Sequence, residues 1–265
     1  MYPALQFNNI NTEKRKEYDM RKNIVTMVRC LFAVIVLSGM VGCNDSCSDS
    51  CNGSSGKLTP VGTAVKLSKF ASTFTGVPGS TPLSFSSLLG SDPQGNPLSG
   101  SLQMTPGSET TVLDDDTICN SSVTTVTLSQ NNSTLVTENI TKYFRVSDGS
   151  FYRMAAVSGR GSTTYVRTTP ADSFAWEDAK VGDSGNWGVF QGSDSTALFI
   201  EWEIDPDVNG GSVFVISEQF YSAGMGMTSE KHYYYLDAEG NPIKFAFRIN
   251  MSDGAYQVSG DVSGH

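Results

Sequence analysis

The sequence predicts an all-β domain over residues 58–265, either an antiparallel β-sandwich or a barrel-like fold. Composition is the first reason, because 26 glycines and only 17% charged residues suit strands and turns better than long helices. The second reason is an alternation of apolar and polar residues along many short runs, which is the period of a strand. The third is that turn-forming residues separate these runs at short intervals, so successive runs would pair through hairpins.

The clearest predicted strand is residues 198–205, in which every second side chain is apolar. Residues 244–251 repeat the pattern. One buried face and one wet face are typical of an antiparallel sheet. The side chains predicted to point inward are Leu198, Ile200, Trp202 and Ile204 in the first run and Phe245, Phe247, Ile249 and Met251 in the second.

Nine further runs have strand character, and turn-forming residues lie between them. The longest interruption, residues 168–185, marks a boundary at which two β halves could meet, near 168–186. The frame D-x-x-G-N-P-apolar occurs at 92–98 and at 237–243, and we interpret it as shared hairpin chemistry and not as an internal repeat. The nine runs are 98–104, 122–129, 134–141, 143–146, 151–157, 163–167, 212–221, 232–236 and 255–262.

Residues 20–42 have the three-part pattern of a signal peptide. A basic region with Arg21, Lys22 and Arg29 precedes an apolar run of 12 residues, 30–41. As a helix this run would reach only ~18 Å, which is short of a hydrocarbon core of ~30 Å. We therefore expect a cleaved signal and not a permanent span. Residues 1–19, upstream of it, are expected to be a non-native or extended N-terminus without folded structure.

The four residues Met40-Val41-Gly42-Cys43 resemble the lipobox of bacterial lipoproteins. The resemblance implies cleavage between Gly42 and Cys43 and acylation of Cys43, by palmitate-type chains, although Met40 stands where a leucine is usual. The alternative is an ordinary cleaved signal, or a buried helix with an incidental cysteine. Residues 43–57, rich in small polar residues, would be a flexible tether. Because Asn44 and not aspartate follows the cysteine, the resemblance favours the outer membrane over the inner one.

Three cysteines, Cys47, Cys51 and Cys119, would remain in an exported chain, where disulfides are permitted. An odd number allows at most one intramolecular bond. It could join Cys47 to Cys51 within the tether, or join either of them to Cys119 and so attach the tether to the domain. We expect no zinc at Cys47 and Cys51, because further ligands are not near them in the sequence.

The charge balance argues against nucleic-acid partners. Of 18 basic and 27 acidic residues, six and three respectively fall in residues 1–42, which leaves 12 basic against 24 acidic in the exported part. Such a surface repels phosphate backbones and anionic head groups. Contact with the membrane is therefore expected through the lipid anchor alone.

Two patterns could support catalysis. Glu201 and Glu203 share the wet face of one predicted strand, with ~6–7 Å between their Cα atoms, and paired carboxylates serve glycoside hydrolysis. Acidic residues on a wet face also serve solubility, which we expect here. A Ser-His-Asp triad would have to use His232 with Ser229, and no nucleophile-elbow motif supports it. We expect His232 to be an ordinary strand residue and the chain not to be an enzyme.

One sequence motif resembles half of a calcium loop. Asp205, Asp207 and Asn209 are spaced as the first three oxygen ligands of such a loop and a glycine follows, but Ile216 replaces the bidentate glutamate. The set therefore predicts at most weak calcium binding, and the alternative is a polar hairpin turn. No other cofactor is expected besides the lipid.

These observations predict a lipid-anchored cell-envelope protein that acts as a non-catalytic binding or structural module with an unknown ligand or protein partner. The alternatives are a carboxylate-based hydrolase and a periplasmic carrier of a lipophilic ligand, which would need an apolar cavity. The stretch Val181-Gly182-Asp183-Ser184-Gly185 before a β region resembles uncharacterised exported bacterial β domains, and that resemblance implies no activity.

Overall fold

The computed structural model describes residues 58–158, 161–172, 174, 176–207, 210–221, 228–251 and 254–262. Within these residues the protein has one helix and thirteen strands, and no helix is long and apolar enough to cross a membrane. The elements are α2 (Ser68–Thr75), β1 (Leu83–Ser91), β2 (Pro97–Pro106), β3 (Thr111–Val112), β4 (Ile118–Gln130), β5 (Ser133–Arg145), β6 (Phe151–Ser158), β7 (Gly161–Arg167), β8 (Ser184–Gly192), β9 (Ala197–Pro206), β10 (Ser212–Tyr221), β11 (Thr228–Leu236), β12 (Pro242–Met251) and β13 (Gly254–Asp261).

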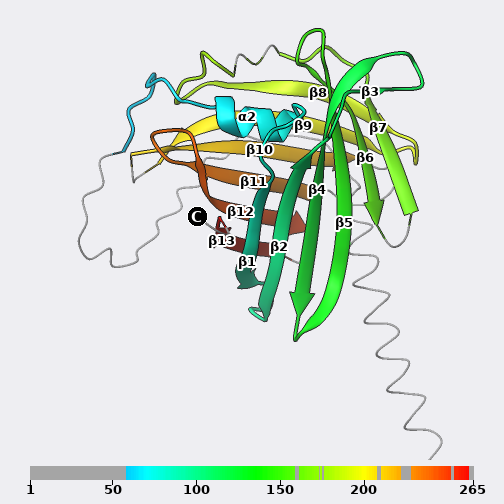
Figure 1. The fold of residues 1–265 in the computed structure, drawn as a ribbon. Coiled ribbons are helices and arrows are strands. Elements are labelled where there is room, and N and C mark those ends of the chain that lie inside the picture. Colours follow the sequence, from blue (N-terminus) through cyan, green and yellow to red (C-terminus); the bar gives the residue numbers. More distant parts are fainter. Residues whose placement is uncertain are drawn as a thin grey trace, which may run out of the picture.

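Twelve of the strands form a closed antiparallel barrel (Figure 1). Each strand pairs with the next along the chain, except that β2 passes over the two-residue β3 and pairs with β4. The pairing of β13 with β1 closes the ring. The prediction of an all-β, barrel-like fold is confirmed, and the short connections explain the order, because consecutive strands joined by tight turns become neighbours.

Most predicted strands are present, with small differences in their bounds. The runs 134–141 and 143–146 are one long strand, β5, and the sequence analysis missed α2, β1, β3 and β8. Tyr165 of β7 pairs with Gly192 of β8, so the strands before and after the interruption at 168–185 belong to the same barrel.

The predicted inward phase of β9 and β12 is confirmed. The side chain of Met251 lies outside what the structure describes. The buried residues of this set are Leu198, Ile200, Trp202, Ile204, Phe245, Phe247 and Ile249.

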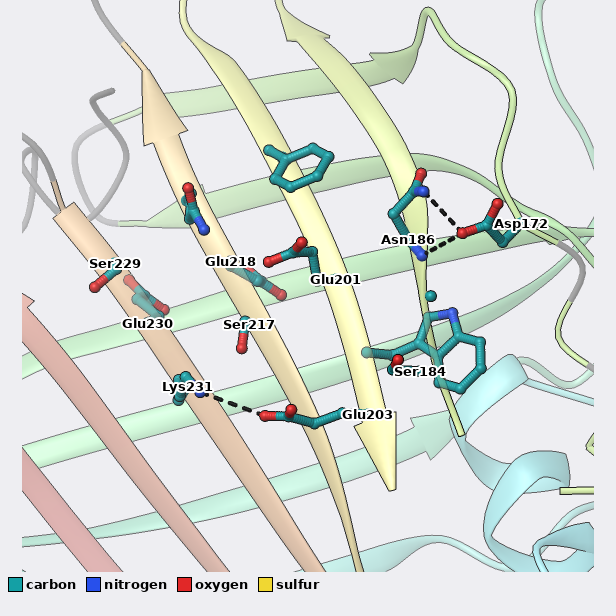
Figure 2. Close-up of a pocket in the computed structure, with 14 residues that line it drawn as sticks. Asp172, Ser184, Asn186, Glu201, Glu203, Ser217, Glu218, Ser229, Glu230 and Lys231 are labelled. Carbon is teal, nitrogen blue, oxygen red and sulfur yellow. Dashed lines mark hydrogen bonds and ion pairs between the residues drawn. The ribbon is translucent and has the colours of Figure 1, made fainter. Parts of the chain in front are cut away.

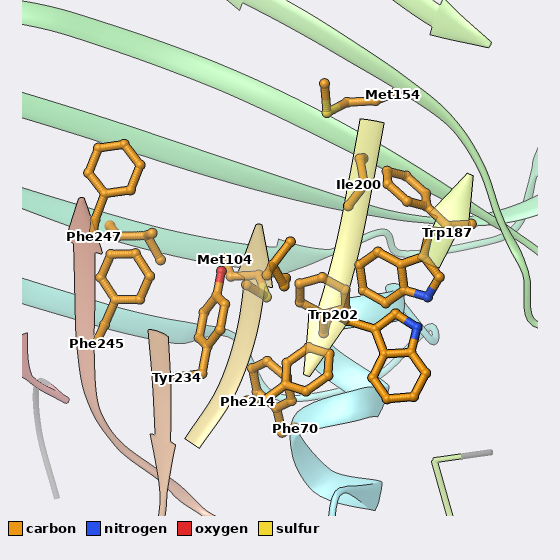
Figure 3. Close-up of a cluster of buried hydrophobic side chains, with 14 of the residues drawn as sticks. Phe70, Met104, Met154, Trp187, Ile200, Trp202, Phe214, Tyr234, Phe245 and Phe247 are labelled. Carbon is orange, nitrogen blue, oxygen red and sulfur yellow. The ribbon is translucent and has the colours of Figure 1, made fainter. Parts of the chain in front are cut away.

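An aromatic core fills the barrel next to α2 (Figure 3). Phe70 and Phe74 lie one helical turn apart, so both point from the helix into the barrel and are fully buried. The ring centre of Phe70 is 4.9 Å from that of Tyr234 and 5.6 Å from that of Phe214. The ring of Phe74 stacks on Trp187 at 5.8 Å. The helix therefore packs against the barrel interior, and its aromatic face is part of the hydrophobic core.

The two D-x-x-G-N-P segments form turns with the same hydrogen bonds. Asp92 Oδ1 accepts from the backbone of Asn96 at 2.7 Å, and its Oδ2 accepts from the Asn96 amide at 2.7 Å. Asp237 holds Asn241 in the same two ways, each at 2.8 Å. The interpretation as shared hairpin chemistry agrees with this geometry, since the turns join different pairs of strands.

Candidate functional site

A polar cleft of about 580 Å³ lies on the outer wall of the barrel, across β8, β9, β10 and β11 (Figure 2). Alternate residues of an antiparallel strand point to opposite faces, so the polar residues next to the core positions of these strands line the outside. The polar side chains that line the cleft include Asn186, Glu201, Glu203, Ser217, Ser229 and Lys231.

Both carboxylates proposed from the sequence lie in this cleft. Glu201 is exposed, and Glu203 forms an ion pair with Lys231 of β11 at 3.4 Å. At one edge Asp172 Oδ2 accepts hydrogen bonds from the backbone and side-chain nitrogens of Asn186, each at 2.8 Å. The segment before β8 is thereby attached to the rim of the cleft.

The inner face of β10 and β11 carries an unexpected cluster of ionisable groups. Glu218 of β10 stands directly opposite Glu230 of β11, and His232 follows two residues later on the same face. Their exposed fractions are 4%, 4% and 5%. One ligand atom of each residue lies within 4.8 Å of the others, and His232 Nε2 is 3.5 Å from Glu230 Oε2.

The opposite wall contributes a second set of buried polar groups. Glu138 and Lys142 of β5 are both buried, and the Lys142 ammonium lies 4.7 Å from the ring centre of Phe74. Ser122 and Thr124 of β4 are buried too, and their hydroxyl oxygens have no hydrogen-bond partner within the described residues. The barrel interior is thus apolar near α2 and ionisable between β4–β5 and β10–β11.

Burial shifts the pKa of each ionisable group in this interior towards its neutral form. Burial, and then the charge of Glu218, raises the pKa of Glu138 to about 8. Burial followed by the charges of Glu218 and Glu138 raises the pKa of Glu230 well above its ordinary value, although Lys142 opposes the shift. Burial and then Lys142 lower the pKa of His232 to about 3, so its imidazole is neutral at physiological pH.

Glu218 and Lys142 follow the same rule. Burial raises the pKa of the Glu218 carboxyl group, and the positive charge of the nearby Lys142 ammonium reduces this increase. Burial lowers the pKa of Lys142, and the charges of Glu218 and then Glu230 oppose it. The Lys142 ammonium therefore partly offsets the effect of burial on two carboxyl groups, those of Glu218 and Glu230.

Two of the three residues of the calcium motif, Asp205 and Asp207, lie in the part of the chain that the structure describes. Asp205 lies at the end of β9, on the same face as Glu203. Its side chain is largely exposed, but neighbouring atoms remove part of the water around its carboxyl group, and this desolvation, followed by the charge of Glu203, raises its pKa. Asp207 is buried and follows the strand, and its backbone carbonyl accepts from Gly210 at 3.4 Å. Asn209 lies outside the described residues.

The cysteine predictions fall mostly outside the described residues, which begin at residue 58. Gly42, Cys43, Cys47 and Cys51 are all in that part. Cys119 is described: it is a free thiol on β4, is completely buried, and has a pKa raised by that burial.

The sequence analysis missed the interior cluster because it treated charged residues as outward-facing. A phase argument would have found part of it, since Glu218 shares the inward phase of Phe214, Ile216 and Phe220 in β10. On β11, Glu230 and His232 likewise share the phase of the buried Tyr234. The residues that β5 adds to the cluster could not be found in this way, because only closure of the barrel brings β5 opposite β10 and β11.

Two further hollows lie beside α2 and the nearby turns. One, of about 470 Å³, is lined by Phe174, Trp176 and Arg167 together with residues of the β5–β6 turn. The other, of about 620 Å³, lies between α2 and the start of β1 and includes Phe70 and Leu83. Loop and turn residues contribute to both, so they are surface hollows and not a chamber along the barrel axis.

The role of the cleft and of the interior cluster has to be inferred from the residues that form them. No known protein family, no curated protein and no solved structure matches this chain.

Proposed function

We propose that this chain is a lipid-anchored cell-envelope protein, attached to the outer membrane through Cys43, whose barrel binds a polar ligand in the β8–β11 cleft without catalysing a reaction. The single observation that carries the proposal is that polar side chains from four neighbouring strands meet in one depression of about 580 Å³. That volume is within the range of small-molecule sites.

The lining of the cleft favours a ligand rich in hydroxyl groups, such as a saccharide segment. Ser217, Gln219 and Ser229 offer donors and acceptors, and Glu201 offers a carboxylate that accepts two or more hydrogen bonds. Phe199 adds an aromatic surface at the same face. A hydroxyl-rich ligand can exchange its water contacts for hydrogen bonds with these groups at little cost.

The start of the described chain is compatible with a tether that leaves the barrel near the cleft strands. Thr59 Oγ1 donates a hydrogen bond to the carbonyl of Gly211 at 2.7 Å, next to the connection between β9 and β10. A tether formed by residues 43–57 would therefore join the domain at the end of two strands that line the cleft.

The test is binding of the full-length protein to an array of bacterial envelope saccharides. We expect saturable binding that weakens ~3- to 10-fold in Glu201→Gln and in Gln219→Ala, because each variant removes hydrogen bonds worth ~1 kcal/mol. Glu239→Gln, on the turn between β11 and β12, is the matched control and should bind like the wild type. The proposal would be refuted if the protein bound no saccharide, or if both cleft variants bound as tightly as the wild type.

The position of Glu201 and Glu203 in one cleft also favours a second candidate, a carboxylate-based hydrolase. The two candidates differ in the effect of Glu201→Gln and in product formation. A hydrolase would release reducing ends from a bound saccharide over time and lose that activity in Glu201→Gln while retaining much of its binding. A carrier of a lipophilic ligand has less support, because aromatic side chains fill the barrel next to α2.

A further inference from the structure

We propose that Glu218, Glu230 and His232 bind one divalent transition-metal ion, of the Zn²⁺ type, inside the barrel. The three side chains lie on the buried face of β10 and β11, behind the outer cleft, whose lining also includes Glu218 and Glu230. Calcium, the ion suggested by the sequence, would be a poor fit to it, since an imidazole nitrogen is among the ligands.

Strand geometry holds the three ligands together before any ion binds. Glu218 and Glu230 are a cross-strand pair, so their side chains leave the sheet side by side. His232 lies on the same face as Glu230, two pairs further along the ladder and opposite Ile216. Their ligand atoms are already within 4.8 Å of one another, so small side-chain rotations would bring all three to metal-bonding distance of ~2 Å.

Two buried polar atoms of the cluster are not satisfied by hydrogen bonds from the described residues. Glu230 Oε1 and His232 Nε2 have no hydrogen-bond partner within the described residues, although Glu230 is 4% exposed and His232 is 5% exposed. A buried polar atom without a partner has lost its hydrogen bonds to water and gained none in the protein, which destabilises the fold, and more so when the atom is charged. A metal ion between these side chains would remove that destabilisation for both atoms at once.

Charge balance gives an independent argument for a divalent ion. The carboxyl groups of Glu218 and Glu230 interact with the ammonium of Lys142, and the carboxyl group of Glu138 interacts with both of these carboxyl groups. Burial favours the protonated carboxyl groups here, so a bound cation would have to displace those protons. With all three carboxyl groups ionised and Lys142 charged, the excess is two negative charges, and like charges directly opposite each other on a sheet are destabilising. One divalent cation neutralises the excess. Lys142 sits over the Phe74 ring, at the side of the cluster nearer the aromatic core.

The ligand types select the class of metal. An imidazole with two carboxylates suits Zn²⁺ and neighbouring first-row ions, whereas Mg²⁺ prefers oxygen ligands alone. Three protein ligands leave a fourth position of a tetrahedral ion for a water molecule. The unpartnered hydroxyl groups of Ser122 and Thr124, on the facing wall, would be candidates to hydrogen-bond such a water.

The test uses the full-length chain without a histidine tag, stripped of metal by dialysis against a chelator. Zn²⁺ binding is measured by competition with a chromophoric zinc chelator and by metal analysis of the dialysed protein. We expect one more bound zinc per chain in the wild type than in Glu230→Gln or His232→Gln, or an affinity at least 100-fold weaker in both variants. Tyr233→Phe, which lies between these strand positions on the outer face, should bind zinc like the wild type.

A thermal melt separates loss of the site from loss of the fold. Metal-free Glu230→Gln should melt at the same temperature as the metal-free wild type or above it, because the opposed carboxyl pair is gone. Zinc should raise the melting temperature of the wild type by several degrees and leave that of Glu230→Gln unchanged. If the wild type binds no zinc, or if both variants bind it as tightly and in the same amount, protons alone neutralise the cluster and the proposal is wrong.

Discussion

The carboxylate of Asp237 is bound to Asn241 through both of its oxygens, with Oδ1 accepting from the backbone N–H and Oδ2 from the side-chain amide. These bonds fix the turn between β11 and β12, where Gly240 has a positive φ of 80°. We expect Asp237→Ala to lower the free energy of unfolding by ~1 kcal/mol at neutral pH, because the turn loses its organising acceptor. Chemical denaturation measures it, and Glu239→Ala in the same turn is the control.

The difference in the free energy of unfolding between Asp237→Ala and the wild type should depend on pH. Burial alone would raise the pKa of Asp237, but hydrogen bonds from Asn241, Glu239 and Gly240 outweigh it, so the pKa lies below its ordinary value. A group with a lowered folded-state pKa stabilises the protein fully above the unfolded pKa of ~4, and loses that contribution as pH falls through the folded pKa. The stability gap should therefore shrink below pH ~4. A gap that widens in acid would show that the carboxylate is not the stabilising form.

Gly76 and Gly79 provide a matched test of close packing at the end of α2. Both have a positive φ, of 76° and 82°, but a Cβ at Gly76 would overlap the backbone carbonyl of Ser121, whereas a Cβ at Gly79 would meet open space. We expect Gly79→Ala to cost ~1 kcal/mol from backbone strain alone. Gly76→Ala should cost a further ~1–3 kcal/mol, because the helix must shift from β4. Equal melting temperatures for the two variants would contradict this packing.

Trp202 is a core residue of β9 with an exposed fraction of 6%, and its ring centre lies 4.3 Å from that of Phe174. We expect Trp202→Ala to destabilise the domain by ~3–5 kcal/mol through the cavity it leaves. Glu201→Ala, one residue earlier on the outer face, should change stability by less than ~0.5 kcal/mol. Urea denaturation of both variants measures the difference, and a stable Trp202→Ala would mean that the aromatic core adjusts around the gap.

Cys43→Ser should abolish lipid labelling and leave an unprocessed precursor, if the lipobox resemblance is functional. Metabolic labelling with a fatty-acid analogue, followed by a mass measurement of the chain, detects both effects. Cys119→Ser is the control, because that thiol is buried in the barrel wall and should not affect labelling. Labelling that persists in Cys43→Ser would place the lipid elsewhere.

Calcium at millimolar concentration should leave the melting temperature unchanged. Asp205 is exposed on the outer face and Asp207 is buried beyond the strand end, so the two carboxylates differ in their surroundings. An ion that bound only the folded protein would stabilise it by ~1.4 kcal/mol at ten times its Kd. Calorimetry with and without a chelator decides the question. A shift of several degrees that disappears in Asp207→Ala would show a calcium site after all.

Two of the strands that the sequence analysis missed, β1 and β8, have a β-bulge inside the strand, where it breaks the alternation of buried and exposed residues. In β1 the register shifts between Phe85 and Leu88, and both residues are buried although they are three positions apart. In β8 the shift lies between Asn186 and Gly188, and it places both Trp187 and Gly188 on the buried side. An extra residue interrupts the period of two on which the prediction depended. The strands without this defect, such as β9 and β10, were found with nearly correct bounds.

The outer cleft was partly predictable and the interior cluster was not. Glu201 and Glu203 share one strand face, so their alternation alone placed them outside. The partnership of Glu218 with Glu138 and Lys142 requires a β10 residue to face β5 across the barrel, and no local pattern encodes that distance. The missed helix, α2, contains four serine or threonine residues in eight, a composition that hid the helical spacing of Phe70 and Phe74.

Closure of the ring has a consequence for how this protein can contact other proteins. In the described barrel β2 pairs with both β1 and β4, and β13 pairs with both β12 and β1, so the ring presents no long strand with a free backbone edge. A partner protein therefore finds no long free edge to which it could add a strand, and neighbouring copies of this protein find none for joining into fibrils. Recognition must instead depend on side chains of the barrel wall and its loops, so changes in specificity can accumulate there without disturbing the backbone ladder.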